Sequence, residues 1–169
     1  MNHYTDMVID DIKLRTNINN EDFITLPEIT KLSGYFYDEE VEIVVEIVNE
    51  TYKNPDCGYM WVIAEIDNKP VGFATYGKVP GSLHSWDLYW IVTGKSLKGC
   101  GIGKKILNFV EAEVVKNGGK ILIAETSGRE LYADTRAFYI ACGYTLEAVI
   151  KEFYGPYDDK IFYVKRLST

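Results

Sequence analysis

A glycine-rich segment near the middle of the chain has the composition of an anion-binding turn. It reads KGCGIGKK over residues 98–105 and lies between a strand-like run and a helix-like run. A turn of this kind exposes backbone N–H groups at a helix N-terminus, where the helix dipole favours phosphate. The segment indicates a site for a phosphorylated ligand or, alternatively, a lysine-rich helix start after a tight turn. Positive charge is added by Lys95, Lys98, Lys104 and Lys105.

The spacing of these glycines excludes two common phosphate-binding motifs. A dinucleotide-binding fingerprint that starts at Gly101 would need glycine where Ile106 stands. One that starts at Gly99 would need glycine where Lys104 stands. A P-loop that ends in the same turn would need Ser or Thr at position 105, where the chain has lysine. The segment therefore predicts neither an NAD site nor a nucleoside triphosphate site.

A second segment with residues that could take part in a reaction reads RAFYIACGY over residues 136–144. It predicts a helix that ends at Gly143, with Tyr139 about one turn before the end. The tyrosine hydroxyl can donate a proton in a reaction, although a tyrosine at this position can also simply pack in the core. Cys142 is interpreted as a buried, inert thiol.

The chain around these segments is expected to contain both strands and helices. Asn20 and Asp134 are expected to cap helices, and residues 77–85 are expected to form a loop. Residues 87–125 read as a strand–helix–strand crossover, so the chain predicts a mixed α/β sheet. Strands are expected at 12–15, 59–66, 71–76, 87–92, 121–125, 144–150 and 160–165, and helices at 21–31, 38–49, 102–116 and 135–141.

Length and composition limit the class of protein. The 169 residues predict one domain over 1–169. No run approaches the length of a membrane span, and the N-terminus carries acids where a signal peptide needs bases. A cytoplasmic protein without a membrane partner is expected. The aromatic content of 14% is compatible with a homodimer.

Charge and cysteine usage exclude further classes. Residues 1–56 hold 13 acidic side chains against 4 basic ones, so nucleic-acid binding is not expected. The three cysteines include no CxxC pair, and there are only two histidines. Neither a disulfide framework nor a metal site is predicted.

Taken together, the two segments resemble motifs of the GNAT superfamily of acetyl-CoA-dependent N-acetyltransferases. The first matches as Lys98-x-x-Gly101-x-Gly103, with lysine where the family has Gln or Arg. The second matches as Phe138-Tyr139-x-x-x-Gly143-Tyr144, and the resemblance covers nearly the whole chain. It implies the acyl-CoA N-acyltransferase fold, a central mixed sheet flanked by about four helices, and transfer of an acetyl group from acetyl-CoA to a primary amine.

The resemblance also implies how CoA is held. The pyrophosphate is expected on the amides of the glycine turn, and the pantetheine arm beside the preceding strand. Tyr132 stands where many members of the family carry an asparagine that binds CoA. The CoA-binding residues implied are Ile91, Val92, Thr93, Lys98, Gly99, Cys100, Gly101, Ile102, Gly103, Lys104, Tyr132 and Arg136.

In the mechanism that the resemblance implies, the amine attacks the thioester directly and Tyr139 is the general acid to the CoA thiolate. A primary amine, with a pKa of about 10.4, must first lose a proton. Glu125, at the end of a strand, is the candidate base, and Asp87 is the alternative. Both could instead be structural carboxylates at strand ends.

Acceptor contacts are expected from the first two helices and the final hairpin. The aromatic candidates are Phe36, Tyr37, Tyr89, Tyr154 and Tyr157, and the acidic candidates are Glu39, Glu40 and Asp158. An aromatic and acidic mouth suits a cationic amine, such as a polyamine, an aminoglycoside or a peptide amine. The competing hypothesis is a non-catalytic CoA-binding sensor or partner-binding module on the same fold, and a longer acyl-CoA is a further alternative.

Overall fold

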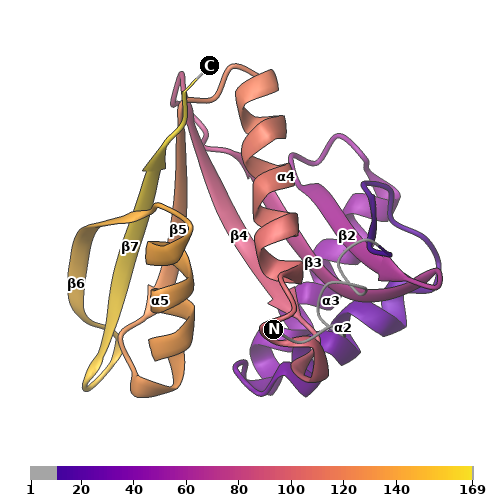
Figure 1. Ribbon diagram of the computed structural model, residues 1–169, viewed down its shortest axis with the longest axis horizontal. Helices are drawn as coiled ribbons and strands as arrows, with labels where there is room; N and C mark the ends of the chain where they lie inside the picture. Colours follow the sequence, from indigo (N-terminus) through magenta and orange to yellow (C-terminus); the bar gives the residue numbers. More distant parts are fainter. Residues whose placement is uncertain (1–10, 169) are drawn as a thin grey trace. The chain divides into compact units, whose positions relative to one another are not determined.

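The computed structural model describes residues 11–168, and this part of the chain contains seven strands and four α-helices (Figure 1). The strands are β1 (Lys13–Arg15), β2 (Met60–Ile66), β3 (Lys69–Lys78), β4 (Ser85–Thr93), β5 (Ile121–Ser127), β6 (Thr145–Gly155) and β7 (Asp158–Arg166). The helices are α2 (Asp22–Ser33), α3 (Asp38–Lys53), α4 (Ile102–Lys116) and α5 (Ala133–Ala141), with short 3₁₀ turns at Lys95–Leu97 and Glu130–Tyr132.

The strands form one mixed sheet in the order β1-β2-β3-β4-β5-β7-β6. β4 and β5 are parallel and are joined through α4, whereas β7 pairs antiparallel with both β5 and β6. This arrangement confirms the predicted mixed α/β sheet with a crossover at residues 87–125. The described residues divide into two compact units: the first comprises residues 11–76 and Trp90–Val110, and the second comprises Gly77–Tyr89 and residues 111–168. The prediction of one domain stays a prediction.

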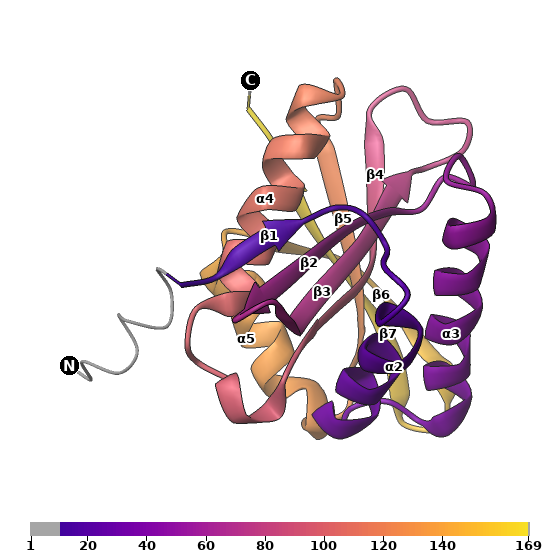
Figure 2. The same cartoon turned by 90° about the vertical axis from the view of Figure 1, so that its right-hand side faces the viewer.

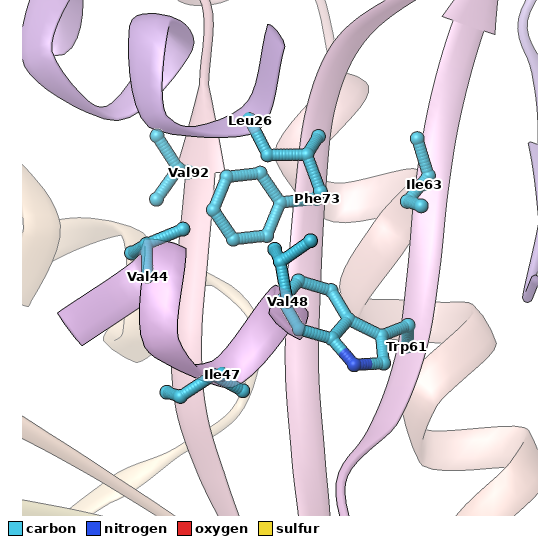
Figure 3. Close-up of a cluster of buried hydrophobic side chains, with 8 residues drawn as sticks. All are labelled: Leu26, Val44, Ile47, Val48, Trp61, Ile63, Phe73 and Val92. Atoms are coloured by element: carbon cyan, nitrogen blue, oxygen red, sulfur yellow. The ribbon is translucent and has the colours of Figure 1, made fainter. Parts of the chain in front are cut away.

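In the first unit, α2 and α3 lie beside β2 and β3 (Figure 2). Their apolar side chains form a core with residues of β2, β3 and the end of β4. Figure 3 shows the ring of Phe73 surrounded by aliphatic side chains from these elements. The spacing of apolar residues on α3 explains why this helix docks, because one face is buried while its acidic residues face solvent. The cluster contains Leu26, Val44, Ile47, Val48, Trp61, Ile63, Phe73 and Val92.

A buried ion pair fixes the start of α2. The guanidinium of Arg15 donates two hydrogen bonds to Asp22, of 2.6 and 2.9 Å, and a third of 2.6 Å to Glu65 on β2. Asp22 is fully buried and also accepts a hydrogen bond from the Asn19 amide at 2.6 Å. Asn20, which the sequence suggested as the cap, is not the cap, because α2 begins at Asp22 and Glu21 is the N-cap residue.

In the second unit, α5 packs on one face of the sheet formed by β5 and β7 (Figure 1). The Tyr139 ring of α5 stacks on Tyr163 of β7 with a centroid distance of 5.7 Å. Residues directly opposite on neighbouring strands share a face, so Ala124 lies on this helix-covered face with Tyr163. Glu125, one residue on, lies on the other face with its partner Phe162.

Several predicted boundaries are wrong. The loop expected at 77–85 is shorter, because β3 continues to Lys78 and β4 begins at Ser85. The last hairpin is longer than expected, since β6 runs to Gly155 after register shifts between Leu146 and Ala148 and again after Ile150. Asp134 lies inside the first turn of α5 and is not its cap. In the part of the chain that is described, no helix is long and apolar enough to cross a membrane.

Candidate functional site

The glycine turn lies in the first unit, between the end of β4 and the start of α4. Gly99 and Gly101 have φ angles of 83° and 79°, a conformation that glycine adopts without steric cost. The amide of Lys105 donates to the Gly101 carbonyl at 3.0 Å and closes the first turn of the helix. This is the first hydrogen bond of the helix. The N–H groups of residues 102–104 come before it in the chain, so they have no acceptor within the helix. The turn thus presents N–H donors at a positive helix end, as the sequence predicted.

The lysines around this turn have different surroundings. Lys95, Lys98 and Lys104 are exposed, and the Lys98 ammonium is hydrogen-bonded to the Tyr35 hydroxyl. Lys105 is half-buried and donates to the carbonyl of Ile12 at 2.8 Å. The charge available to an anion therefore comes mainly from the three exposed lysines. The contact of Lys98 with Tyr35 was not anticipated, because the two residues lie 63 positions apart in the sequence.

The end of β4 is held rigidly against β3. The amide of Gly94 donates to the Val71 carbonyl at 2.8 Å. A Cβ on Gly72 would lie 2.8 Å from the Val92 carbonyl oxygen and 3.3 Å from Ile106 on α4, so no larger residue fits there. Val92 itself is 3% exposed, while Ile91 and Thr93 are half-buried. The backbone of Ile91–Thr93 is therefore fixed in position just before the glycine turn.

Tyr139 lies in the second unit, buried among other tyrosines. It is 3% exposed, with the ring of Tyr144 5.5 Å away and that of Tyr163 5.7 Å away. Burial, together with the nearby Cys142, raises the pKa of Tyr139 above its ordinary value of 10.0. The hydroxyl therefore carries its proton throughout the neutral range. This is the protonation state that a general acid needs, and it also suits a packed core tyrosine.

Arg136 and Tyr132 are engaged in local contacts. The Nη1 atom of Arg136 donates to the carbonyls of Ser127 at 3.0 Å and Arg129 at 2.7 Å. Tyr132 is 8% exposed, and the Arg129 guanidinium lies 5.5 Å from its ring centroid. These contacts hold residues 127–132 before α5. A role of Arg136 and Tyr132 in CoA binding stays a prediction.

The two candidate bases belong to one charge cluster in the second unit. Glu125 on β5 forms an ion pair of 2.5 Å with Lys160 on β7. Partial burial raises the pKa of Asp87 on β4, the Glu125 carboxylate raises it further, and Lys160 opposes the shift. Asp87 is thus more easily protonated than an ordinary aspartate, whereas Glu125 is ion-paired with the Lys160 ammonium.

Aromatic rings complete this cluster, and sequence reasoning missed most of them. The Lys160 ammonium lies 4.1 Å from the ring centroid of Phe153, 5.6 Å from that of Phe162 and 5.7 Å from that of Tyr154. Only Tyr154 was predicted to contact substrate. The alternation in β7 could have suggested that Lys160 and Phe162 share a face, but the bulged register of β6 carries no sequence signal.

The predicted acceptor residues fall in both units. In the first, the Phe36 ring packs against Trp90 at a centroid distance of 4.9 Å, and Tyr37 is 58% exposed. In the second, Tyr89 is 39% and Tyr154 51% exposed. Tyr37, Tyr89 and Tyr154 therefore present ring surface to solvent, whereas Phe36 also serves the core.

Comparison with known proteins assigns the class. Residues 21–144 match the model of the acetyltransferase (GNAT) family. The crystal structure of a candidate GNAT acetyltransferase from Desulfovibrio desulfuricans is 36% identical, with a TM-score of 0.89 over 93% of this chain and 99% of that one. The chain belongs to the GNAT acetyltransferase family. No curated protein matches it by sequence.

Two more distant structures share the fold and contain the cofactor. An aminoglycoside 6'-N-acetyltransferase complexed with coenzyme A is 20% identical, with a TM-score of 0.74 over 94% of this chain and 97% of that one. A candidate acetyltransferase from Salmonella typhimurium with acetyl-CoA is 16% identical, with a TM-score of 0.73 over 94% and 95% of the two chains. The resemblance read from the two sequence motifs is thus confirmed for family and fold.

Proposed function

We propose that the protein is an N-acetyltransferase that moves an acetyl group from acetyl-CoA to a primary amine. The observation that carries the proposal is the glycine turn, with Gly99 and Gly101 at positive φ ahead of α4, in a chain of the GNAT family. The fold shared with two structures that contain CoA or acetyl-CoA supports it. A small cationic amine is the proposed acceptor class.

The residues of the turn fit a phosphorylated cosubstrate by their chemistry. The amides of residues 102–104 and the exposed Lys95, Lys98 and Lys104 are the proposed pyrophosphate ligands. The backbone of Ile91–Thr93 is the proposed partner of the pantetheine arm, and its fixed position lowers the entropy lost on binding. Acetyl-CoA supplies an activated thioester to this site.

Residues of the chain would then carry out two proton transfers. A carboxylate of the Asp87–Glu125 pair accepts the proton that the acceptor ammonium must lose, directly or through water. Tyr139, kept protonated by burial, gives its proton to the departing CoA thiolate. A positioned acid or base of this kind contributes about 10²–10⁴-fold to the rate.

Cosubstrate binding is tested by thermal unfolding with and without acetyl-CoA. At about 100-fold excess over Kd, a bound ligand adds about 2.7 kcal/mol, which raises Tm by roughly 5–10 °C for a domain of this size. Gly101→Glu should abolish the rise. Gly118→Glu is the matched control, because the φ of Gly118 is 80°, close to the 79° of Gly101, but Gly118 lies past the other end of α4. A rise that survives in Gly101→Glu would contradict the proposed site.

The acid role is tested by Tyr139→Phe in an assay of amine acetylation. We expect kcat to fall about 10²-fold with little change in acetyl-CoA affinity. Tyr163→Phe is the control, since Tyr163 is equally buried in the same stack. An unchanged kcat in Tyr139→Phe would refute the acid role. Binding of acetyl-CoA without acetylation of any amine would favour the non-catalytic CoA-binding module.

A further inference from the structure

An ammonium group in the second unit lies inside a cage of aromatic rings. The cage consists of Phe153 and Tyr154 on β6 and Phe162 on β7, with the Lys160 Nζ atom 4.1–5.7 Å from their centroids. The Lys160 side chain is 15% exposed and ion-paired with Glu125. Rings at such distances attract a cation through their negative faces. The cage thus already binds an alkylammonium group, the one that the protein carries itself.

The cage and its two carboxylates lie on the same face of the sheet. Glu125 is directly opposite Phe162, and Lys160 lies two residues before Phe162 on β7. Asp87 is opposite Ile123, two residues before Glu125 on β5, and therefore lies on that face too. The candidate proton acceptors and the ammonium-binding rings are consequently neighbours.

The cage is open to exchange. Phe153 and Tyr154 are each 51% exposed, although the ammonium between the rings is largely covered. Glu125 is the partner of Lys160, and its side chain is 40% exposed. With Asp87 and Glu125 ionised, Lys160 compensates one of two negative charges. A second cation would therefore be attracted to this face, and the walls that would contact it are accessible from solvent.

We propose that the cage of Phe153, Tyr154 and Phe162 recognises a charged amine of the acceptor, and that Lys160 fills the cage until the acceptor binds. The inference rests on the proposed function and names the acceptor class more narrowly. The acceptor carries two amines: one, deprotonated, attacks the thioester, and the other, still charged, replaces the Lys160 ammonium between the rings. Exchange of one alkylammonium for another conserves the cation–π contacts.

Binding to the cage is measured without catalysis by NMR titration with tetramethylammonium, which cannot be acetylated. Lys160→Ala empties the cage, and we expect it to bind the probe at least about tenfold more tightly than the wild type. Lys151→Ala is the matched control, because Lys151 is 80% exposed and pairs with Asp159 instead. Adding Phe153→Leu to Lys160→Ala should abolish the gain. Equal affinities in Lys160→Ala and wild type would overturn the inference.

A second measurement leaves Lys160 in place, so this test remains possible even if the Lys160→Ala variant fails to fold. Acetylation of 1,5-diaminopentane is compared with that of 5-amino-1-pentanol, which has the same length but one charge. We expect a KM about tenfold lower for the diamine. Phe153→Leu should raise the KM of the diamine about tenfold and bring it close to the KM of the amino alcohol. Equal KM values for the two amines, or an equal effect of Phe153→Leu on both, would overturn the inference.

The two proposals fail in different ways. If no primary amine is acetylated but Lys160→Ala binds tetramethylammonium more tightly than the wild type, the cage is supported as a cation site and the proposed function is wrong. If both amines are acetylated equally and the cage variants change nothing, the proposed function stands and the inference about the cage is refuted.

Discussion

Strand β7 carries two lysines that face opposite sides of the sheet and have opposite surroundings. On the face covered by α5, Lys165 forms an ion pair of 2.7 Å with Glu111 and donates to the Cys142 carbonyl at 2.9 Å. Glu111 also accepts a hydrogen bond from the Tyr144 hydroxyl at 3.1 Å. On the other face, Lys160 has the Glu125 carboxylate and three aromatic rings.

The difference shows how one residue type can stabilise a fold or leave a site available. An ammonium has three donors with directional preferences, and Lys165 commits two of them to fixed oxygen atoms that lie on α4 and after α5. Rings attract a cation with little directional demand, so the contacts of Lys160 tolerate replacement by another cation. Lys165 therefore ties β7 to α4 and to the end of α5, whereas Lys160 fills a cation site that another cation could fill.

The largest expected effect separates the two lysines by stability. Lys165→Met leaves the largely buried Glu111 without its cation and should lower the free energy of unfolding by about 2–3 kcal/mol. Lys160→Met should cost at most about 1 kcal/mol, because Glu125 is partly exposed and Met keeps favourable contacts with the rings. Urea denaturation measures both. Equal losses would remove the distinction between the two faces.

The next effect concerns alkaline pH and only the helix-covered face. Burial raises the pKa of both Tyr139 and Tyr144, and Glu111 adds to the shift for Tyr144. Above pH of about 10 the unfolded tyrosine releases its proton and the folded one retains it, so stability falls as the pH rises. Each tyrosine contributes a slope of up to about 1.4 kcal/mol per pH unit.

Tyr139→Phe and Tyr144→Phe should each flatten the fall in unfolding free energy, measured from pH 9 to 11. Tyr157→Phe, at a residue 92% exposed, is the control and should leave the slope unchanged.

The smallest effect belongs to the cage face. Because burial and Glu125 raise the pKa of Asp87, its contribution to stability is present below the unfolded pKa of 3.8 and is lost as the pH rises. Asp87→Asn should therefore stabilise the protein at pH 7 by about 0.5 kcal/mol and make no difference at pH 3. A loss of stability at pH 7 would show instead that the Asp87 carboxylate is favourably paired.

The glycine turn could be predicted from sequence because its geometry is local. Gly99 and Gly101 stand where the backbone needs positive φ, and the amides follow from the helix start alone. The helix caps were harder to predict from the sequence. Asn20 and Asp134 have suitable side chains, but the ion pair of Asp22 with Arg15 decides where α2 begins, and that pair depends on β1 and β2.

The cage could not be predicted because it depends on register. Glu125 and Tyr154 were identified one by one, yet Phe153 and Lys160 reach each other only through the shifts in the pairing of β6 with β7. A strand of regular pairing would alternate Phe153 and Tyr154 between faces. Phe153 and Tyr154 instead both approach the Lys160 ammonium, and they directly follow Glu152, whose φ is 54°.

These irregularities of β6 have a consequence for the protein at high concentration. β6 is the last strand in the sheet order, and its side chains are exposed from Thr145 to Tyr154. A straight, apolar edge would be a template for strand addition by another molecule. The two register shifts break the regular pairing of β6 with β7, so the strand is not straight, and charged Glu147 and Lys151 stand between the apolar residues. The distortion that shapes the cage therefore also protects the sheet edge from aggregation.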